Sequence, residues 1–442
     1  MESITDMPKY ESYKKSGVEY VGCIPKYWNI SKLKFLARIF TGDSISPSLK
    51  DKLISFDESE RPYISSKDIN VHTSGIDYDN GIRIPIDSKQ FKVAPVQSSL
   101  LCIEGGSAGK KIAFTDHEVC FVNKLACFKS SKISNKYIFY SLFSSPFQTQ
   151  FKLSMSGLIG GVSISSINNF VITVPPKEEQ LLIVKYLDKK TSQLDEAISV
   201  KEQQISLLRE RKRVIIRQAI TQGIKPGVLM KDCGVDWIGT TPKHWKVVRF
   251  KNLFSQSRLP VRKGDGVVTS YRDGQVTLRA NRRLDGYTEA ILEGGYQGIR
   301  KGQLVLNSMD AFEGAIGVSD SDGKCTPEYV VCDPIRNDIS PYYFALLLRE
   351  MALSKYIQVI CNAVRQRAVR IRFNNLATRF MIVPPKSEQD AIVRHIDTET
   401  SKIDVAIGQL NHQINKLKEF KTTLINSAVT GKIRITPEMA EG

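Results

Sequence analysis

One seven-residue segment occurs twice in this chain of 442 residues. Residues 174–180 read Val-Pro-Pro-Lys-Glu-Glu-Gln, and residues 383–389 read Val-Pro-Pro-Lys-Ser-Glu-Gln, 209 positions further on. The similarity then continues without a gap to Ala219 in the first copy and to Ala428 in the second. A match of this length at one fixed offset indicates an internal duplication.

Each copy is expected to end a strand and to begin a long helix. Two consecutive prolines force the residues before them into an extended conformation, and they are tolerated in the first turn of a helix. Glu178, Glu179 and Glu388 then fall in that first turn, where negative charge suits the helix dipole. Between Lys177 and Gln222 there is room for a helix of roughly 65 Å, at about 1.5 Å per residue.

Apolar residues recur along both predicted helices at seven-residue spacing, with further apolar positions four residues after several of them. Such a narrow seam is typical of a two-helix coiled coil, and the simplest partner for each helix is the other copy. We predict an antiparallel pair in which Lys201 interrupts the first seam. Ordinary amphipathic helices inside one globule remain the alternative. The predicted helix-pair interface comprises Leu194, Ile198, Ile205, Leu208, Ile215, Ile403, Ile407, Leu410, Ile414, Leu417 and Leu424.

A second repeated segment precedes each of two longer and dissimilar regions. Residues 17–28 and 234–245 both begin with Gly-Val, an acidic residue and an aromatic one, and both end with Pro-Lys-x-Trp. Gly, Pro and aromatic residues at fixed spacing indicate an irregular segment held by aromatic burial. Because the second copy directly follows the first helix, we expect the first copy to lie near the end of the second helix. The chain would then close on itself around a pseudo-twofold axis.

The two dissimilar regions follow one scheme. Short β-type runs broken by Gly, Asp, Asn and Ser lead to a single helical run, at residues 135–153 in the first region and 342–360 in the second. The predicted fold class is α/β (α+β), with two variable domains separated by two long helices. The predicted division is a first domain at 1–173, a spacer helix at 174–222, a second domain at 223–382, a spacer helix at 383–432 and a C-terminal tail at 433–442.

The charge balance is strongly basic. The chain has 63 Lys and Arg residues against 46 Asp and Glu, a formal net charge of +17. Such a surplus is typical of proteins that bind nucleic acid, although a basic surface that only maintains solubility remains the alternative. Neither the first ten residues nor any later run has the apolar character of a signal peptide or a membrane span. We therefore expect a cytoplasmic protein without a membrane partner.

We expect no catalytic residue and no metal site in this chain. The eight cysteines form no Cys-x-x-Cys pair, so buried free thiols on strands are favoured over a metal site. The five histidines show neither metal-binding nor triad spacing. Neither proline pair has the preceding Asn or Asp and the following Tyr or Phe of amino-methyltransferases that act on bases. The sequence therefore predicts binding without bond breaking.

In the first domain, the candidate DNA contacts centre on residues 104–111, Glu-Gly-Gly-Ser-Ala-Gly-Lys-Lys. This is not a Walker A motif, because only three residues separate Gly105 from Gly109 and no Ser or Thr follows the lysine. The glycine turn and its lysines could approach a backbone phosphate or a groove, and a plain hairpin turn is the alternative. The candidate residues are Ser66, Lys67, Lys110, Lys111, Asn123 and Lys124.

In the second domain, arginines are dense on both sides of residues 308–317, Ser-Met-Asp-Ala-Phe-Glu-Gly-Ala-Ile-Gly. Arginine pairs bidentately with guanine and glutamine with adenine, so Arg365-Gln366-Arg367 is a candidate base-reading cluster. The alternation continues at Arg370 and Arg372, which favours strands with one basic face, whereas a solvated charged strand is the alternative. The candidates are Arg272, Arg279, Arg282, Arg283, Met309, Asp310, Arg365, Gln366 and Arg367.

The two repeated segments and the variable domains between them resemble a Type I restriction-modification specificity subunit over essentially the whole chain. The resemblance implies two target-recognition domains, each of which reads one half of a bipartite sequence in double-stranded DNA. It also implies that the helices set the spacer and bind two modification subunits, which carry S-adenosylmethionine. Restriction subunits that use ATP and magnesium can join such an assembly. This chain would itself bind no cofactor.

Two other functions remain open from the residues alone. A fused methyltransferase or nuclease is disfavoured by the missing catalytic motifs. A coiled-coil scaffold with basic domains that bind protein, or that bind DNA without sequence preference, would share the composition and the helices. Absence of sequence preference in DNA binding would favour the scaffold.

We predict that Arg365→Ala or Arg367→Ala changes recognition of one half-site only, because an arginine that contacts a base edge acts at one position of the target. Binding of the full chain to duplexes that differ in one half-site measures this. An equal loss on all duplexes would instead identify a phosphate contact.

Overall fold

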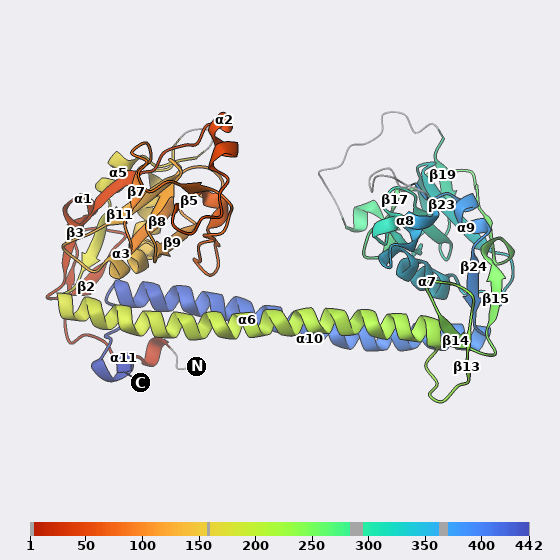
Figure 1. Cartoon of the computed structure of the whole chain (residues 1–442). Helices are drawn as coiled ribbons and strands as arrows, with labels where there is room; N and C mark the ends of the chain where they lie inside the picture. Colours follow the sequence, from red (N-terminus) through yellow and green to blue (C-terminus); the bar gives the residue numbers. More distant parts are fainter. Residues whose placement is uncertain (1–3, 157–159, 283–294, 362–369, 442) are drawn as a thin grey trace. The chain divides into compact units, whose positions relative to one another are not determined.

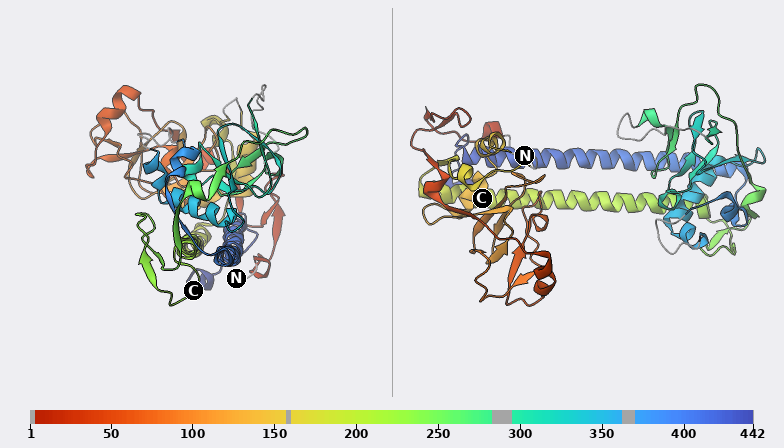
Figure 2. Two further views of the ribbon diagram at one scale, coloured as in Figure 1. Left: turned by 90° about the vertical axis from the view of Figure 1, so that its right-hand side faces the viewer. Right: turned by 90° about the horizontal axis from the view of Figure 1, so that it is seen from above.

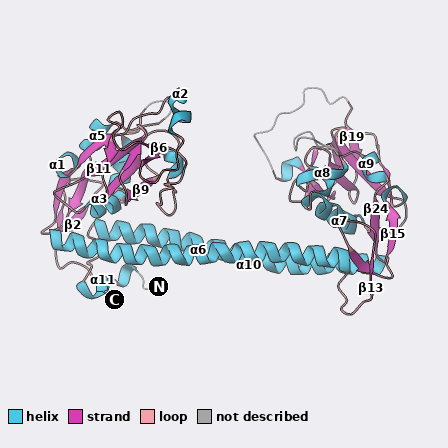
Figure 3. Ribbon diagram, in the orientation of Figure 1, coloured by secondary structure: helices cyan, strands magenta, loops and turns pink. Residues whose placement is uncertain are grey.

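The structure is a computed structural model that describes residues 4–156, 160–282, 295–361 and 370–441. The chain divides into two compact units, Met1–Glu202 with Asn411–Gly442, and Gln203–Leu410. Each unit contains one α+β domain together with one part of each long helix (Figure 1, Figure 3). The two units are described separately below.

The core of the first unit is a four-stranded antiparallel sheet whose central strands are buried on both faces. Leu101 and Phe128 point into a cluster with helix α3, whereas Leu100 and Cys127 pack with Phe121 of a second sheet. Successive strand side chains point to opposite faces, so an unbroken apolar strand requires a layer on each side. The first sheet has the spatial order β4 (Arg38–Thr41), β11 (Leu125–Lys129), β8 (Ser98–Cys102) and β9 (Ile112–Thr115). The second sheet has the spatial order β6 (Arg83–Ile84), β5 (Arg61–Ile64), β10 (Val119–Phe121) and β7 (Val93–Ala94).

The second unit has a sheet of the same order and the same alternation. Leu304 and Cys332 face helix α7 (Pro341–Leu353), whereas Val305 and Val331 pack on two small two-stranded sheets. The four-stranded sheet is β16 (Phe254–Gln256), β23 (Tyr329–Pro334), β20 (Leu304–Asn307) and β21 (Ile316–Val318). The two-stranded sheets are β17 (Val268–Ser270) with β18 (Val276–Leu278), and β19 (Gln297–Ile299) with β22 (Gly323–Cys325).

Each predicted single helical run is in fact two helices. The first is α3 (Asn135–Ser141) and α4 (Ser145–Leu153), and the second is α7 (Pro341–Leu353) and α8 (Tyr356–Ile360). Ser144 accepts a hydrogen bond from the Phe147 amide and so starts α4 anew. Lys355 has a left-handed φ of 65°, which ends α7. The sequence-based prediction missed both breaks, although polar residues and a proline interrupt the apolar pattern there, at Ser144-Ser145-Pro146 and at Ser354-Lys355.

A buried glutamine (Gln180 or Gln389) and a tryptophan (Trp28 or Trp245) join each domain to the start of its long helix. These helices are α6 (Lys177–Gln222) and α10 (Lys386–Val429). The strand before the prolines pairs with the strand after the head segment, β12 (Val171–Val174) with β3 (Asn29–Lys32) and β24 (Phe380–Val383) with β15 (Lys246–Arg249). The indole of Trp28 donates to Glu179 at 2.5 Å, and that of Trp245 donates to Glu388 at 2.9 Å. The repeated residues therefore make the same contacts in both units.

The far end of the other long helix closes each unit. The Tyr137 hydroxyl donates to the Val429 carbonyl at 3.1 Å in the first unit, and the Tyr343 hydroxyl donates to the Ile220 carbonyl at 2.7 Å in the second. Burial raises the pKa of both tyrosines, so both remain protonated donors. As expected, the first head segment lies at the end of the second helix, where Gly431 packs on Pro25 and Trp28.

The two long helices lie side by side and antiparallel within each unit (Figure 2). In the first unit Lys421 pairs with Asp195 at 2.7 Å, and Lys201 donates to Gln413 at 2.7 Å. The polar interruption at Lys201 thus has a polar partner on the other helix. Of the predicted interface, Leu194, Ile198, Ile205, Ile403, Ile414, Leu417 and Leu424 are buried, and Leu208, Ile215, Ile407 and Leu410 are half-buried.

We expect Gln389→Ala to lower the free energy of unfolding by about 1–3 kcal/mol, because the fully buried amide accepts from the Ser340 amide and donates to the carbonyls of Asp338 and Pro384. Denaturant titration of the full chain measures the loss. Gln203→Ala, at an exposed position of α6, is the matched control, and an equal effect of the two substitutions would contradict the prediction.

Candidate nucleic-acid interface

Three loops of the first domain bring its candidate DNA contacts together. The Lys111 ammonium donates to the Ser66 carbonyl at 2.6 Å, which ties the glycine turn to the short helix η3 (Ser66–Asp68). The Lys124 ammonium lies 3.6 Å from Glu104, and the Ile103 amide donates to the Lys124 carbonyl at 2.9 Å. Residues that are distant in the sequence therefore form one continuous surface.

The lysines of this surface have different roles. Lys67 and Lys124 leave 67% and 48% of their side chains exposed, and Lys110 is exposed beside them. These exposed ammonium groups are available to contact phosphate oxygens. Lys111 is half-buried and holds the Ser66 carbonyl, so its structural role is to position η3. Asn123 is exposed next to Lys124 and presents both a donor and an acceptor.

The glycine turn is a hairpin connection between β8 and β9, and five of its amides already donate within the protein. The amides of Gly105, Ala108 and Gly109 donate to carbonyls of the protein, at 2.8–2.9 Å. The amides of Lys110 and Lys111 both donate to the Ser107 carbonyl. The turn is therefore a hairpin, as the alternative had it, and these five amides are not free to bind a phosphate. Contact of its lysine side chains with DNA stays a prediction.

In the second domain, Arg272 bridges two acidic residues. Its guanidinium donates to Asp310 at 2.9 Å and also pairs with Glu313. The hydrogen bond to Asp310, assisted by the charges of both acids, raises the pKa of Arg272. The arginine side chain is 62% exposed, so these pairs are weakly held and can be exchanged for phosphate or base contacts. Met309 lies exposed beside them.

Arg282 and Arg279 flank this network. The Arg282 guanidinium donates to Asp273 at 2.8 Å and lies 4.1 Å from the centre of the Tyr271 ring. Arg279 donates to the Thr269 hydroxyl at 3.2 Å. Arg372 directly precedes helix α9 (Phe373–Ala377) and does not lie on a strand, so the predicted basic strand face is wrong there. The candidates Arg283, Arg365, Gln366 and Arg367 lie outside the described residues.

Sequence reasoning missed Arg349, which lies on α7 and contacts the backbone of Arg272. Its guanidinium donates to the Gly314 carbonyl at 2.9 Å, and burial lowers its pKa. The available signal was the charged pair Arg349-Glu350 in the otherwise apolar run 343–352, because a charge at such a position requires nearby partners.

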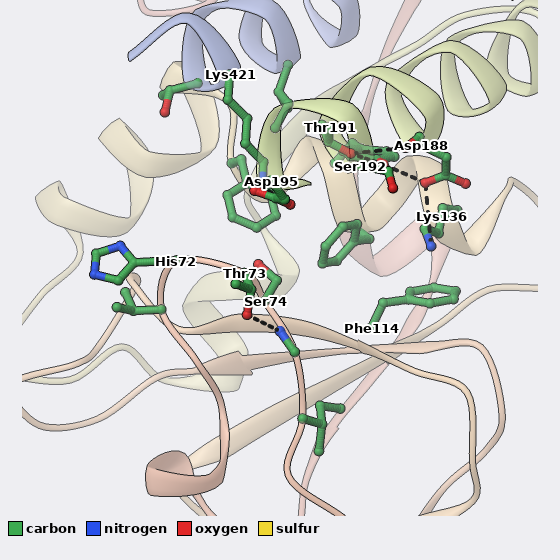
Figure 4. Close-up of a pocket in the computed structure, with 18 of the residues that line it drawn as sticks. His72, Thr73, Ser74, Phe114, Lys136, Asp188, Thr191, Ser192, Asp195 and Lys421 are labelled. Atoms are coloured by element: carbon green, nitrogen blue, oxygen red, sulfur yellow. Dashed lines mark hydrogen bonds and ion pairs between the residues drawn. The ribbon is translucent and has the colours of Figure 1, made fainter. Parts of the chain in front are cut away.

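A cleft of about 750 Å³, lined by both polar and apolar side chains, lies in the first unit between the domain and the long helices (Figure 4). Lys136 pairs with Asp188 at 3.5 Å, and the Tyr140 hydroxyl donates to the same carboxylate at 2.5 Å. Burial, with the hydrogen bond to Asp188, raises the pKa of Tyr140. The labelled lysines, Lys136 and Lys421, are therefore each paired with a labelled aspartate, Asp188 or Asp195.

The described part of the chain contains no group of three or more His, Cys, Asp or Glu residues that could hold a metal ion. The cysteines are free, and five of them, Cys102, Cys120, Cys127, Cys325 and Cys332, are buried on strands. Within the same described residues, no helix combines the length and the apolar character needed to cross a bilayer.

In the comparisons with known proteins, the family model and the relatives named here all concern Type I specificity subunits. Residues 25–207 match the family model of the Type I restriction modification DNA specificity domain. The chain is 20% identical over 297 residues to the EcoBI specificity subunit of Escherichia coli, covering 62% of this chain and 60% of that protein. It is 22% identical over 298 residues to the EcoKI specificity subunit of Escherichia coli strain K12, covering 64% and 61%. The matches thus span about three fifths of each relative's length.

A solved structure has the same fold. It comes from a study of complex assembly and conformational transition of the type I R-M system. The TM-score is 0.66 at 14% sequence identity, and the match covers 92% of this chain and 98% of that one. At this identity the likeness concerns the fold.

We expect Lys110→Ala to weaken binding to all DNA duplexes to a similar degree and to reduce the slope of log affinity against log salt by about 1, because a phosphate contact carries no sequence information. Titrations at several salt concentrations measure both effects. Lys26→Ala removes one charge at an exposed position of the head segment and serves as the control. A loss confined to some sequences would contradict a phosphate contact.

Proposed function

We propose that this chain is a Type I restriction-modification specificity subunit, the DNA-reading, non-catalytic component of such an enzyme. The observation that carries the proposal is a repeated frame with different loops. Trp28 and Trp245 make the same contact with the start of a long helix, while the exposed loops of the two domains share no residue pattern. Such a molecule can hold two different DNA-binding surfaces on the same structural framework.

In this proposal, each variable domain is a target-recognition domain that reads one half of a bipartite target in double-stranded DNA. The first domain presents lysines and an asparagine from three joined loops. The second presents Arg272, whose side chain is exposed and forms ion pairs with acidic residues that DNA can replace. Arginine supplies bidentate donors to base edges or phosphate, and lysine supplies a point charge.

The proposal further assigns the spacer and the docking of two modification subunits to the duplicated long helices. Lys212 pairs with Asp404 at 2.7 Å in the second unit, as Lys421 pairs with Asp195 in the first, which supports one register for the pair. Leu207 and Val214 are exposed on α6 at seven-residue spacing, with 65% and 45% of each residue accessible. An exposed apolar row on a paired helix favours contact with another subunit.

The chemistry then belongs to the partners. S-adenosylmethionine would be bound by the modification subunits, and ATP and magnesium by restriction subunits that join the complex. This chain would supply the DNA sequence preference in the cytoplasm and bind no cofactor of its own.

Co-expression with a modification subunit, followed by mapping of adenine methylation across a genome, tests the proposal. The expected result is a stable complex and a methylated motif in two parts with a fixed spacer. A chain that forms no complex and yields no motif would be a basic scaffold instead.

We expect the tolerated spacer to lengthen by about three base pairs when seven residues are inserted into each helix, after Lys201 and before Gln413, which contact each other. A heptad preserves the apolar seam and adds about 10 Å at about 1.5 Å per residue, and DNA rises about 3.4 Å per base pair. The methylated motif of the variant complex reports the spacer. The same insertion after the exposed Gly227 is the control, and an unchanged spacer in the helix variant would refute the role of the helices.

A further inference from the structure

Arg349, on helix α7, connects two loops of the second domain by hydrogen bonds to their backbones. Its Nη1 donates to the Gly314 carbonyl at 2.9 Å and to the Arg272 carbonyl at 3.4 Å. Gly314 ends the short helix η6 (Ala311–Glu313), and Arg272 lies in the turn between β17 and β18. One guanidinium on α7 therefore holds the backbones of both loops.

The glycines around Arg349 make this close approach possible. A Cβ at Gly274 would lie 1.8 Å from the Arg349 Nη1, and Gly274 has a φ of 93°. A Cβ at Gly317 would lie 2.0 Å from the Gly274 carbonyl oxygen. Gly314, with a φ of 96°, adopts a conformation that other residues rarely reach. The local sequence thus leaves room for the guanidinium and for little else.

The two loops held by Arg349 carry the exposed ion pairs. Arg272 reaches from the turn to Asp310 and Glu313 on the η6 loop. Exposed ion pairs of this kind contribute little to stability and do not by themselves fix a side chain in one orientation. The half-buried guanidinium of Arg349 contacts both backbones at once, and planar guanidinium groups are well suited to such paired contacts.

We propose that Arg349 is a positioning residue for target recognition by the second domain. It fixes the turn that carries Arg272 against the loop that carries Met309 and Asp310, so that Arg272 meets the DNA in one orientation. The role in recognition rests on the proposed DNA-reading function, whereas the positioning of the two loops does not.

Hydrogen exchange of the full chain tests the positioning without DNA. Arg349→Met is expected to speed exchange of the amides of Gly274, Gly314 and Ala315 about tenfold or more, because these amides close the two loops. Arg349→Lys retains a donor and should restore part of the protection. Arg336→Ala, an exposed arginine paired with Asp338, is the control. Unchanged exchange in Arg349→Met would overturn the proposal, and amides of β20 report whether the domain is still folded.

A double-mutant cycle in the complex with modification subunits tests the role in recognition. Arg349→Met and Arg272→Ala should each lower methylation through the second domain's half-site about tenfold, and the double variant should lose no more than Arg272→Ala alone. Losses that multiply would show that Arg349 only supports the fold and would overturn the proposal. A wild-type complex without sequence preference would refute the proposed function, while the exchange result would still decide whether Arg349 positions the loops.

Discussion

The junction where a strand ends at two prolines and a long helix begins is the constraint on which the rest of the molecule depends. Prolines have no N–H to donate, and the carbonyl of the first, buried proline needs a hydrogen-bond partner. Gln180 meets this need by donating to the Pro175 carbonyl and accepting from the Ser134 amide, and Gln389 does the same with Pro384 and Ser340. Each glutamine thereby binds a domain to its helix, and the adjacent tryptophan excludes water.

A frame held in this way allows the exposed loops to change without loss of the fold. The central sheet of each domain has one apolar layer on either side, so its stability depends on residues that the loops do not supply. The first domain uses this freedom to present lysines tied by carbonyl contacts, and the second presents arginines tied by acids. Different surfaces on one frame are what two independent readers require.

Sequence reasoning found the helices, the head segments and the loops that carry Lys110 and Arg272. It did not find the breaks at Ser144 and Lys355, which a local cap and a single backbone angle set, although Ser144-Ser145-Pro146 was a readable signal for the first. It assigned the glycine turn amides to a ligand, although they bond to nearby carbonyls such as that of Ser107. It also missed Arg349, whose acceptors lie in loops 35 and 77 positions away.

The sequence by itself determined the repeated elements, because periodic apolar residues, proline pairs and spaced tryptophans act through local geometry and burial. It also determined the basic charge and the residue types that the loops can offer. Only the tertiary structure decided which of those residues are free to meet a ligand, since Lys111 and the turn amides are used internally while Lys110 and Arg272 remain exposed. That division depends on hydrogen bonds between segments far apart in the chain, and no local pattern encodes their partners.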